Sequence, residues 1–149
     1  MGAIQGFFRL PFYKRRLIIE AAVMISFTNF GLHLTSFQKL QSFFQQLFRL
    51  NKVRYQKTHP NKSDIAWAIE TTGQKLFKDD TCLVIALAGQ SLLKLYGIPA
   101  KLQLGCLKGD KKTIFAHAWV ESDGEVIIGG TERDISKYTP LTDLKGVRV

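Results

Sequence analysis

The spacing of apolar residues predicts helices in the first two thirds of the chain and strands in the last third. An apolar run over residues 17–25 follows Leu10-Pro11, and proline is favoured at the first position of a helix. We therefore expect a buried helix that begins near Pro11. A second helix follows Thr35 or Ser36 as its N-cap. Its apolar stripe comprises Phe37, Leu40, Phe43, Phe44, Leu47 and Phe48.

Two more helices are predicted before the strands begin. One spans 65–77, with Ser63 or Asp64 as its N-cap, and Gly73 interrupts it without ending it. The other starts at Cys82, after residues 79–81, all of which are suitable N-caps.

The start of this last helix favours a reactive thiol. Gly97 is a natural C-terminal stop for the helix, and Pro99 prevents it from resuming. Cys82 is then in the first turn, where free backbone N–H groups and the helix dipole favour a thiolate. The carboxylates of Asp79 and Asp80 act in the opposite direction, because a nearby negative charge disfavours a second anion.

Alternating apolar and polar residues predict three strands after this helix, over residues 100–107, 113–121 and 125–128. Asp123-Gly124 is typical of a two-residue hairpin turn, so the last two strands should pair antiparallel. Residues 131–149 should cover the sheet, anchored by residues 138–141. The pattern as a whole predicts an α+β fold.

Length and composition fit one compact domain, with 46% hydrophobic and 22% charged residues. The charge is uneven. Residues 1–62 contain ten Lys or Arg and a single acid, Glu20, whereas residues 63–149 contain eleven residues of each sign. We divide the chain into a basic helical arm (1–62), which ends in a polar linker (51–62), and a core (63–149). The basic half indicates either an acidic partner or a solvated basic face.

The first apolar helix is not predicted to span a bilayer. Its apolar run is short, and Glu20, Asn29 and His33 interrupt it. A buried helix, or one that lies against a partner, fits better. Cations flank the run, so a weak contact of residues 1–34 with a membrane surface is an alternative. No nucleic-acid-binding motif accompanies the basic residues, and we expect no nucleic-acid partner.

The two cysteines do not resemble a disulfide framework, because Cys82 starts a helix and Cys106 falls in a strand. The sequence lacks CxxC, HExxH, GxGxxG and Walker patterns, so neither a metal site nor a bound cofactor is expected. It also lacks a signal-peptide pattern at its N-terminus. We therefore expect the protein in the reducing cytoplasm.

Cys82 and His117 are the candidate catalytic pair. A thiol at a helix start, followed in the chain by an imidazole on a strand, is the order that a nucleophile with a general base requires. Trp119 shares a strand face with His117 and could form a wall of the site. The structural alternatives are a small buried Cys82, a packed His117 and a core Trp119.

A catalytic imidazole needs a partner that fixes its tautomer. In the predicted hairpin Val120 pairs with Ile127, which places His117 opposite the second glycine of Gly129-Gly130. These glycines have no side chain for the role, and Glu121 and Asp123 lie too far along the strand. The remaining candidates are a backbone carbonyl or one of three side chains that follow, Thr131, Glu132 and Asp134.

With these residues in view, the chain resembles the leader-peptide-removing cysteine protease of lasso peptide biosynthesis, the transglutaminase-like B protein, in its short stand-alone form. The resemblance covers most of the chain. It rests on Leu10-Pro11 with the basic and then apolar helix, and on the segments Ala66–Glu70, Thr81–Leu83, Ala86–Ala88, Tyr96–Ala100 and Ala116–Glu121 with Gly124.

This resemblance implies a transglutaminase-like (papain-like) core in which the Cys82 helix packs on a small antiparallel sheet, with an N-terminal helical arm. It implies that Cys82 is the nucleophile and His117 the general base of leader-peptide cleavage. Members with an acidic third residue place it where this chain has Gly129-Gly130. The implied partners are the precursor peptide, a small leader-recognition protein and an ATP-dependent macrolactam synthetase. A transglutaminase-like acyltransferase and a catalytically inactive binding scaffold remain alternatives.

Overall fold

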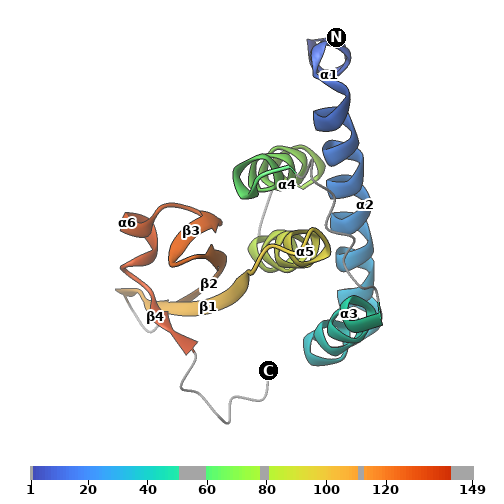
Figure 1. Ribbon diagram of the computed structural model, residues 1–149. Coiled ribbons are helices and arrows are strands. Elements are labelled where there is room, and N and C mark those ends of the chain that lie inside the picture. The colour runs from blue at the N-terminus through green and yellow to red at the C-terminus, as the bar shows by residue number, and fades with distance from the viewer. Residues whose placement is uncertain (1, 51–59, 78–80, 111–112, 142–149) are drawn as a thin grey trace.

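The computed structural model describes residues 2–50, 60–77, 81–110 and 113–141, with the longer helices on one side and a small antiparallel sheet, accompanied by a short helix, on the other (Figure 1). The predicted combination of helices with a small antiparallel sheet is confirmed. Residues 51–59 of the predicted linker, the predicted caps Asp79 and Asp80, and residues 142–149 of the predicted cover lie outside the described residues. The helices are α1 (Gly2–Arg9), α2 (Phe12–Leu34), α3 (Phe37–Leu50), α4 (Lys62–Leu76), α5 (Cys82–Leu95) and α6 (Glu132–Ile135). The strands are β1 (Lys101–Lys108), β2 (Ile114–Ser122), β3 (Glu125–Ile128) and β4 (Thr139–Pro140).

Helix α2 is longer than the apolar run from which it was predicted, and Pro11 is its N-cap residue. One face of α2 is buried through Leu17, Ala21, Ile25 and Thr28, which recur every three or four residues. This face packs against α4 and α5. The basic N-terminal segment is therefore part of the same hydrophobic core as the helix that begins at Cys82.

Helix α4 begins earlier than predicted because Asn61, and not Ser63 or Asp64, is its N-cap. The Asn61 side chain accepts a hydrogen bond from the backbone N–H of Asp64 at 2.8 Å. Gly73 lies inside α4, as predicted, against Ile85 of α5. Because Ile69 lies near Gly89 while Gly73 contacts Ile85, the two helices run antiparallel.

Helix α5 ends as the sequence predicted, in a Schellman motif. Gly97 has a φ of 74°, which is accessible to glycine at little cost. The backbone N–H of Ile98 donates to the carbonyl of Leu93, and that of Gly97 to Lys94. The turn leads at once into β1, so the start of β1 lies at the C-terminal end of α5.

The sheet has the strand order β3-β2-β1-β4, and its paired strands are antiparallel. Asp123 and Gly124 form the predicted hairpin turn, both with positive φ, as a type I′ turn requires. The predicted register is wrong by one residue, because a β-bulge pairs Val120 with Ile128 and not with Ile127.

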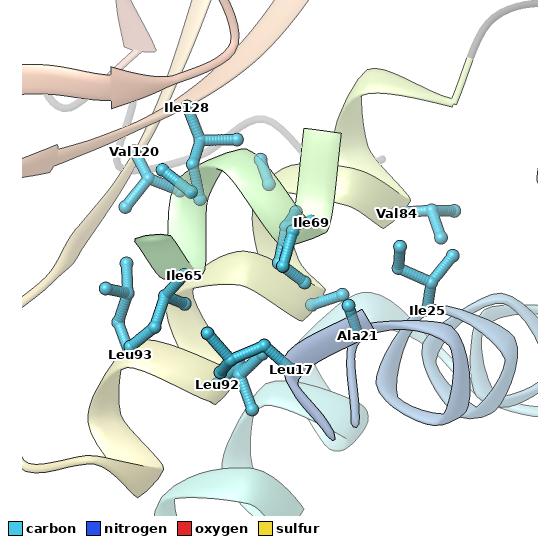
Figure 2. Close-up of a cluster of buried hydrophobic side chains, with 14 of the residues drawn as sticks. Leu17, Ala21, Ile25, Ile65, Ile69, Val84, Leu92, Leu93, Val120 and Ile128 are labelled. Carbon is cyan, nitrogen blue, oxygen red and sulfur yellow. The ribbon is translucent and has the colours of Figure 1, made fainter. Parts of the chain in front are cut away.

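The core lies between the helices and one face of the sheet (Figure 2). Ala118 and Val120 of β2 and Ile128 of β3 face the helices and belong to one core cluster with side chains of α4 and α5, which contact the sheet. Gly89 of α5 permits close contact with β3, because a Cβ at Gly89 would lie 2.4 Å from Ile128 Cδ1. The small residues of α5 therefore set the distance between helix and sheet.

The contact between Gly89 and Ile128 can be tested by a double-mutant cycle. We expect Gly89→Ala to lower the free energy of unfolding by about 1–2 kcal/mol, because the added methyl group overpacks a buried site. In an Ile128→Val background, which lacks the Cδ1 atom, the same substitution should be neutral or stabilising, as alanine favours helix over glycine. Urea unfolding of the four proteins measures the coupling. An equal cost in both backgrounds would show that Ile128 does not limit the approach.

Candidate active site

His117 lies in the middle of β2, half-buried, and its ring is held by a backbone carbonyl. Its Nε2 atom is 2.6 Å from the carbonyl oxygen of Gly129. A carbonyl can only accept a hydrogen bond, so Nε2 carries the proton. In the neutral ring the lone pair is then on Nδ1, which is the nitrogen able to accept a proton. Of the alternatives left open by the sequence, the backbone carbonyl is the one that contacts the ring.

The Gly129 backbone is in turn anchored by α4. Its N–H donates to Oε1 of Glu70 at 3.1 Å. Helix α4 also reaches the other end of β3, where Lys62 Nζ lies 2.9 Å from Glu125 Oε2 and 3.4 Å from Asp123 Oδ2. The hydrogen bond to Glu125 raises the pKa of Lys62. One helix therefore contacts both ends of the strand that positions the His117 partner.

Sequence reasoning missed Glu70. The signal available was an acid in the middle of the predicted helix, directly after the apolar run that ends at Ile69. The partner of Glu70 is a backbone N–H far away in the sequence, so no spacing rule could have indicated the contact.

Gly129 occupies a position that only glycine fits. Its φ is +96°, and a Cβ at this position would lie 2.8 Å from the carbonyl oxygen of Ala118 and 2.9 Å from Trp119 Cβ. The Gly129 backbone can approach β2 only because this residue has no side chain. The same feature explains why no carboxylate stands at this position.

Two aromatic rings lie beside His117. The Trp119 ring is 6.2 Å from it with an interplanar angle of 19°, and the Tyr138 ring is 5.2 Å away. Trp119 is 2% exposed, and its Nε1 donates to Glu121. Gly105, opposite His117 on β1, leaves room for these rings, because a Cβ there would lie 2.8 Å from the Trp119 ring. Tyr138 was expected only as an anchor of the cover.

Of the three side chains considered as orienters of His117, two have another role and one is exposed. Thr131 and Asp134 form a capping box at the start of α6, with Thr131 Oγ1 donating to Asp134 Oδ2 at 2.6 Å. This hydrogen bond from the hydroxyl lowers the pKa of Asp134. Glu132 is exposed. In the described ranges, no group of three or more His, Cys, Asp or Glu side chains could hold a metal ion.

Cys82 is the first residue of α5, and its thiol is free and half-buried against the core. Thr81 occupies the N-cap position but makes no side-chain capping hydrogen bond. The first turn of α5 contains no acid. The backbone N–H groups at this helix start favour a nearby anion, whether a thiolate or the oxyanion of an acyl intermediate.

Cys82 and His117 lie toward the same end of the helical layer and of the sheet. Cys82 precedes Gly89, the residue that contacts Ile128, by about 10 Å of helix. His117 precedes Val120, the pairing partner of Ile128, by about 10 Å of strand. The opposite end is where α5 leads into β1, because Lys101 pairs with Glu121.

The structure does not join the two groups directly. Because side chains alternate along β2, Ala118 and Val120 face the helices, whereas His117 and Trp119 point to the other face of the sheet. Among the residues described, no hydrogen bond links the Cys82 thiol to the His117 ring. The catalytic roles of these two residues therefore stay a prediction.

A comparison with protein families finds a match that includes both Cys82 and His117. The family model of the transglutaminase-like superfamily matches residues 28–143, from within α2 to beyond β4. The chain therefore belongs to the transglutaminase-like superfamily, which typically includes cysteine-dependent enzymes. No curated protein and no solved structure matches the chain.

The tautomer of His117 can be measured directly. We expect ¹⁵N-edited NMR above the ring pKa to show His117 protonated at Nε2, because the Gly129 carbonyl accepts from that atom. His33, which is exposed near the end of α2, provides an internal reference and should show a tautomer mixture. A His117 signal typical of the Nδ1–H tautomer would contradict the contact with Gly129.

The requirement for glycine at 129 can be separated from the general cost of a positive φ. Gly129→Ala should lower the free energy of unfolding by about 3 kcal/mol or more, through strain and steric overlap together. Gly124→Ala is the matched control, since Gly124 has a φ of +79° but no atom within 4 Å of its added Cβ. Its cost should be about 1 kcal/mol. Equal costs in chemical denaturation would show that the approach of Gly129 to β2 is not tight.

Proposed function

We propose that this protein is a cysteine protease that removes the leader peptide from a lasso peptide precursor, with Cys82 as nucleophile and His117 as general base. Membership of the transglutaminase-like superfamily supports cysteine-dependent acyl chemistry. The observation that carries the proposal is the hydrogen bond between His117 Nε2 and the Gly129 carbonyl, because it leaves Nδ1 as a base.

The proposed reaction is acyl transfer to water through a thioester. Nδ1 of His117 takes the thiol proton, and the Cys82 sulfur attacks the carbonyl carbon at the leader–core junction. The Cys82 backbone N–H stabilises the resulting oxyanion. The imidazolium then gives its proton to the leaving amine as the C–N bond breaks. Finally, His117 takes a proton from water, the hydroxide attacks the thioester, and the carboxylate and the thiol are released.

For this chemistry the thiol and the ring must approach each other at the edge of the sheet. The edge strand β3 ends at Ile128, which pairs with Val120, so no residue of β3 is paired with His117. Ala116, the residue before His117 on β2, is exposed and small. The end of β3 and this small residue support an approach at this edge.

The assignment to a leader peptidase rests on particular segments. Packing or backbone geometry alone explains the residue type in several of the segments on which the resemblance rests. Ala86 and Ala88 are fully buried, and Gly97 ends α5. The segment Ala116–Glu121 contains the candidate base and its stacked Trp119, and packing alone does not require a histidine there. This segment is therefore the strongest support for the finer assignment.

The proposed partners follow from the same assignment. They are the precursor peptide, a small protein that holds the leader, and an ATP-dependent macrolactam synthetase. Basic residues are concentrated in positions 1–62, which contain only one acid, and this charge suits contact with acidic segments of such partners.

A second candidate function is a scaffold that binds precursor or synthetase without cleaving it. Two observations favour it: no hydrogen bond joins Cys82 to His117 in the described part of the chain, and the partner of the ring is a carbonyl and not a carboxylate. A carbonyl orients the ring but gives less stabilisation of the imidazolium than a carboxylate.

The two cysteines of the chain provide the decisive test. We expect Cys82→Ala to lower the rate of precursor cleavage by about a thousandfold or more, because the nucleophile is lost. Cys106→Ala is the matched control: Cys106 is also free and half-buried but lies on β1, and its variant should keep the wild-type rate. Mass spectrometry of precursor incubated with the recognition protein measures both. Undiminished cleavage by the Cys82→Ala protein would refute the nucleophile.

The same experiment separates the alternatives. A product heavier by a bound amine in place of water would indicate an acyltransferase. Precursor that binds but stays intact with the wild-type protein and all partners would indicate a scaffold. Iodoacetamide labelling across pH gives independent evidence, since a Cys82 that reacts no faster than Cys106 at neutral pH lacks an activated thiolate.

A further inference from the structure

The outer face of α2 is apolar and uncovered. Six large side chains on this face are between 46% and 76% exposed: Phe12, Ile19, Val23, Phe27, Phe30 and Leu34. They recur at helical spacing on the side opposite the buried residues Leu17, Ala21 and Ile25. Figure 1 shows α2 at the periphery of the molecule, with α4, α5 and the sheet all on its other side. We refer to these six residues as the outer apolar face.

This face continues onto the neighbouring helices. Phe8 of α1 is 66% exposed, and Phe43 of α3 is 48% exposed. The rings of Phe27 and Phe43 lie 6.2 Å apart, so α3 extends the surface at its far end. A contiguous apolar surface of this kind on a folded domain marks an interaction site.

The charges around the face are almost entirely positive. Arg9 ends α1, Arg15 and Arg16 are in the first turns of α2, and Lys39 is exposed on the same side of α3 as Phe43. Lys14 lies instead on the side of α4, over the Trp67 ring and 3.9 Å from Asp64. Residues 1–50 include one acid, Glu20, whose carboxylate accepts hydrogen bonds from Arg16 and Tyr96. If a second copy of the chain covered this face, two positively charged borders would lie side by side and repel each other. The charge is complementary to a negatively charged surface.

Helix α2 is long and apolar enough to cross a membrane, with a mean hydropathy of 1.6. The shorter apolar run seen in the sequence did not predict a membrane span. A spanning role conflicts with the fold, because Ala21, Ile25 and Thr28 are fully buried against protein. Only one side of α2 is free to meet lipid. This geometry suits a helix that lies in the membrane plane.

We propose that the outer apolar face of α2 rests on the surface of an anionic lipid bilayer, with the cations at its ends near the lipid headgroups. Between Ile19 and Leu34 this face presents few hydrogen-bonding side chains, whereas protein interfaces form about one hydrogen bond per 100–200 Å². An aromatic and aliphatic face bordered by cations matches the acyl and headgroup layers of a bilayer. The proposal is independent of the proposed protease function.

The test uses the full-length protein with sedimented vesicles of phosphatidylcholine, alone or with phosphatidylglycerol. We expect binding to the anionic vesicles that exceeds binding to the neutral ones, by about fivefold for each cation near the surface. Replacement of Val23 and Phe30 by serine should lower this binding about tenfold or more. Both positions are exposed, so the melting temperature should hardly change.

Matched controls exist elsewhere on the chain. Ile114 and Phe115 on β2 are 71% and 53% exposed, and their replacement by serine should leave vesicle binding unchanged. For charge, Arg9→Gln with Lys39→Gln should weaken binding to anionic vesicles, whereas Lys108→Gln with Lys137→Gln should not, although both pairs remove two charges. A Phe30→Trp protein should be quenched by brominated lipid, and a Phe115→Trp protein should not be.

Three results would overturn the proposal. The first is the absence of binding to anionic vesicles. The second is an equal loss of binding from the serine pairs on α2 and β2, which would show non-specific adhesion. The third is a dimer in light scattering that separates when Val23 and Phe30 become serine, since the face would then be covered by a second copy.

Discussion

The backbone of Gly129 is the point on which the candidate site depends. Its N–H donates to Glu70 of α4, and its carbonyl holds Nε2 of His117. The two peptide units that meet at the Gly129 Cα therefore link the helical layer to the ring that is expected to act as a base. Because both backbone groups of Gly129 are used and its φ of +96° sets how the two peptide units are turned, the ring orientation follows from the packing of α4 against β3. The β-bulge at Val120 and the positive φ of Gly129 bring this residue against β2.

Second in importance is the close contact between α5 and the sheet. Ala86, Ala88 and Gly89 are small and buried, which lets the Cys82 helix lie directly under Ile128. The same packing fixes where the helix start can be, since α5 cannot slide past Ile128 without opening the core. An approach of the thiol to the ring is consequently limited by the position of the α5 start and by the end of β3 at Ile128.

The basic N-terminal segment combines two requirements that usually belong to different helices. One face of α2 completes the core with α4 and α5, and the other presents aromatic and aliphatic side chains to the outside. A helix that is apolar on all sides has no clear amphipathic period, so its sequence indicates burial without saying what covers each face. The sequence accordingly left a buried helix, a partner contact and a membrane contact open as alternatives.

The sequence by itself determined the local elements. Gly97 ends α5, Asp123-Gly124 turns the hairpin, and the alternation along β2 places His117 and Trp119 on one face, because each of these features depends only on neighbouring residues. Contacts between distant residues were decided by the tertiary structure. These are the carbonyl partner of His117, the contact of Glu70 with Gly129, and the one-residue shift at the bulge. Backbone groups have the same chemistry at every position, so only folding shows which of them meets a given side chain.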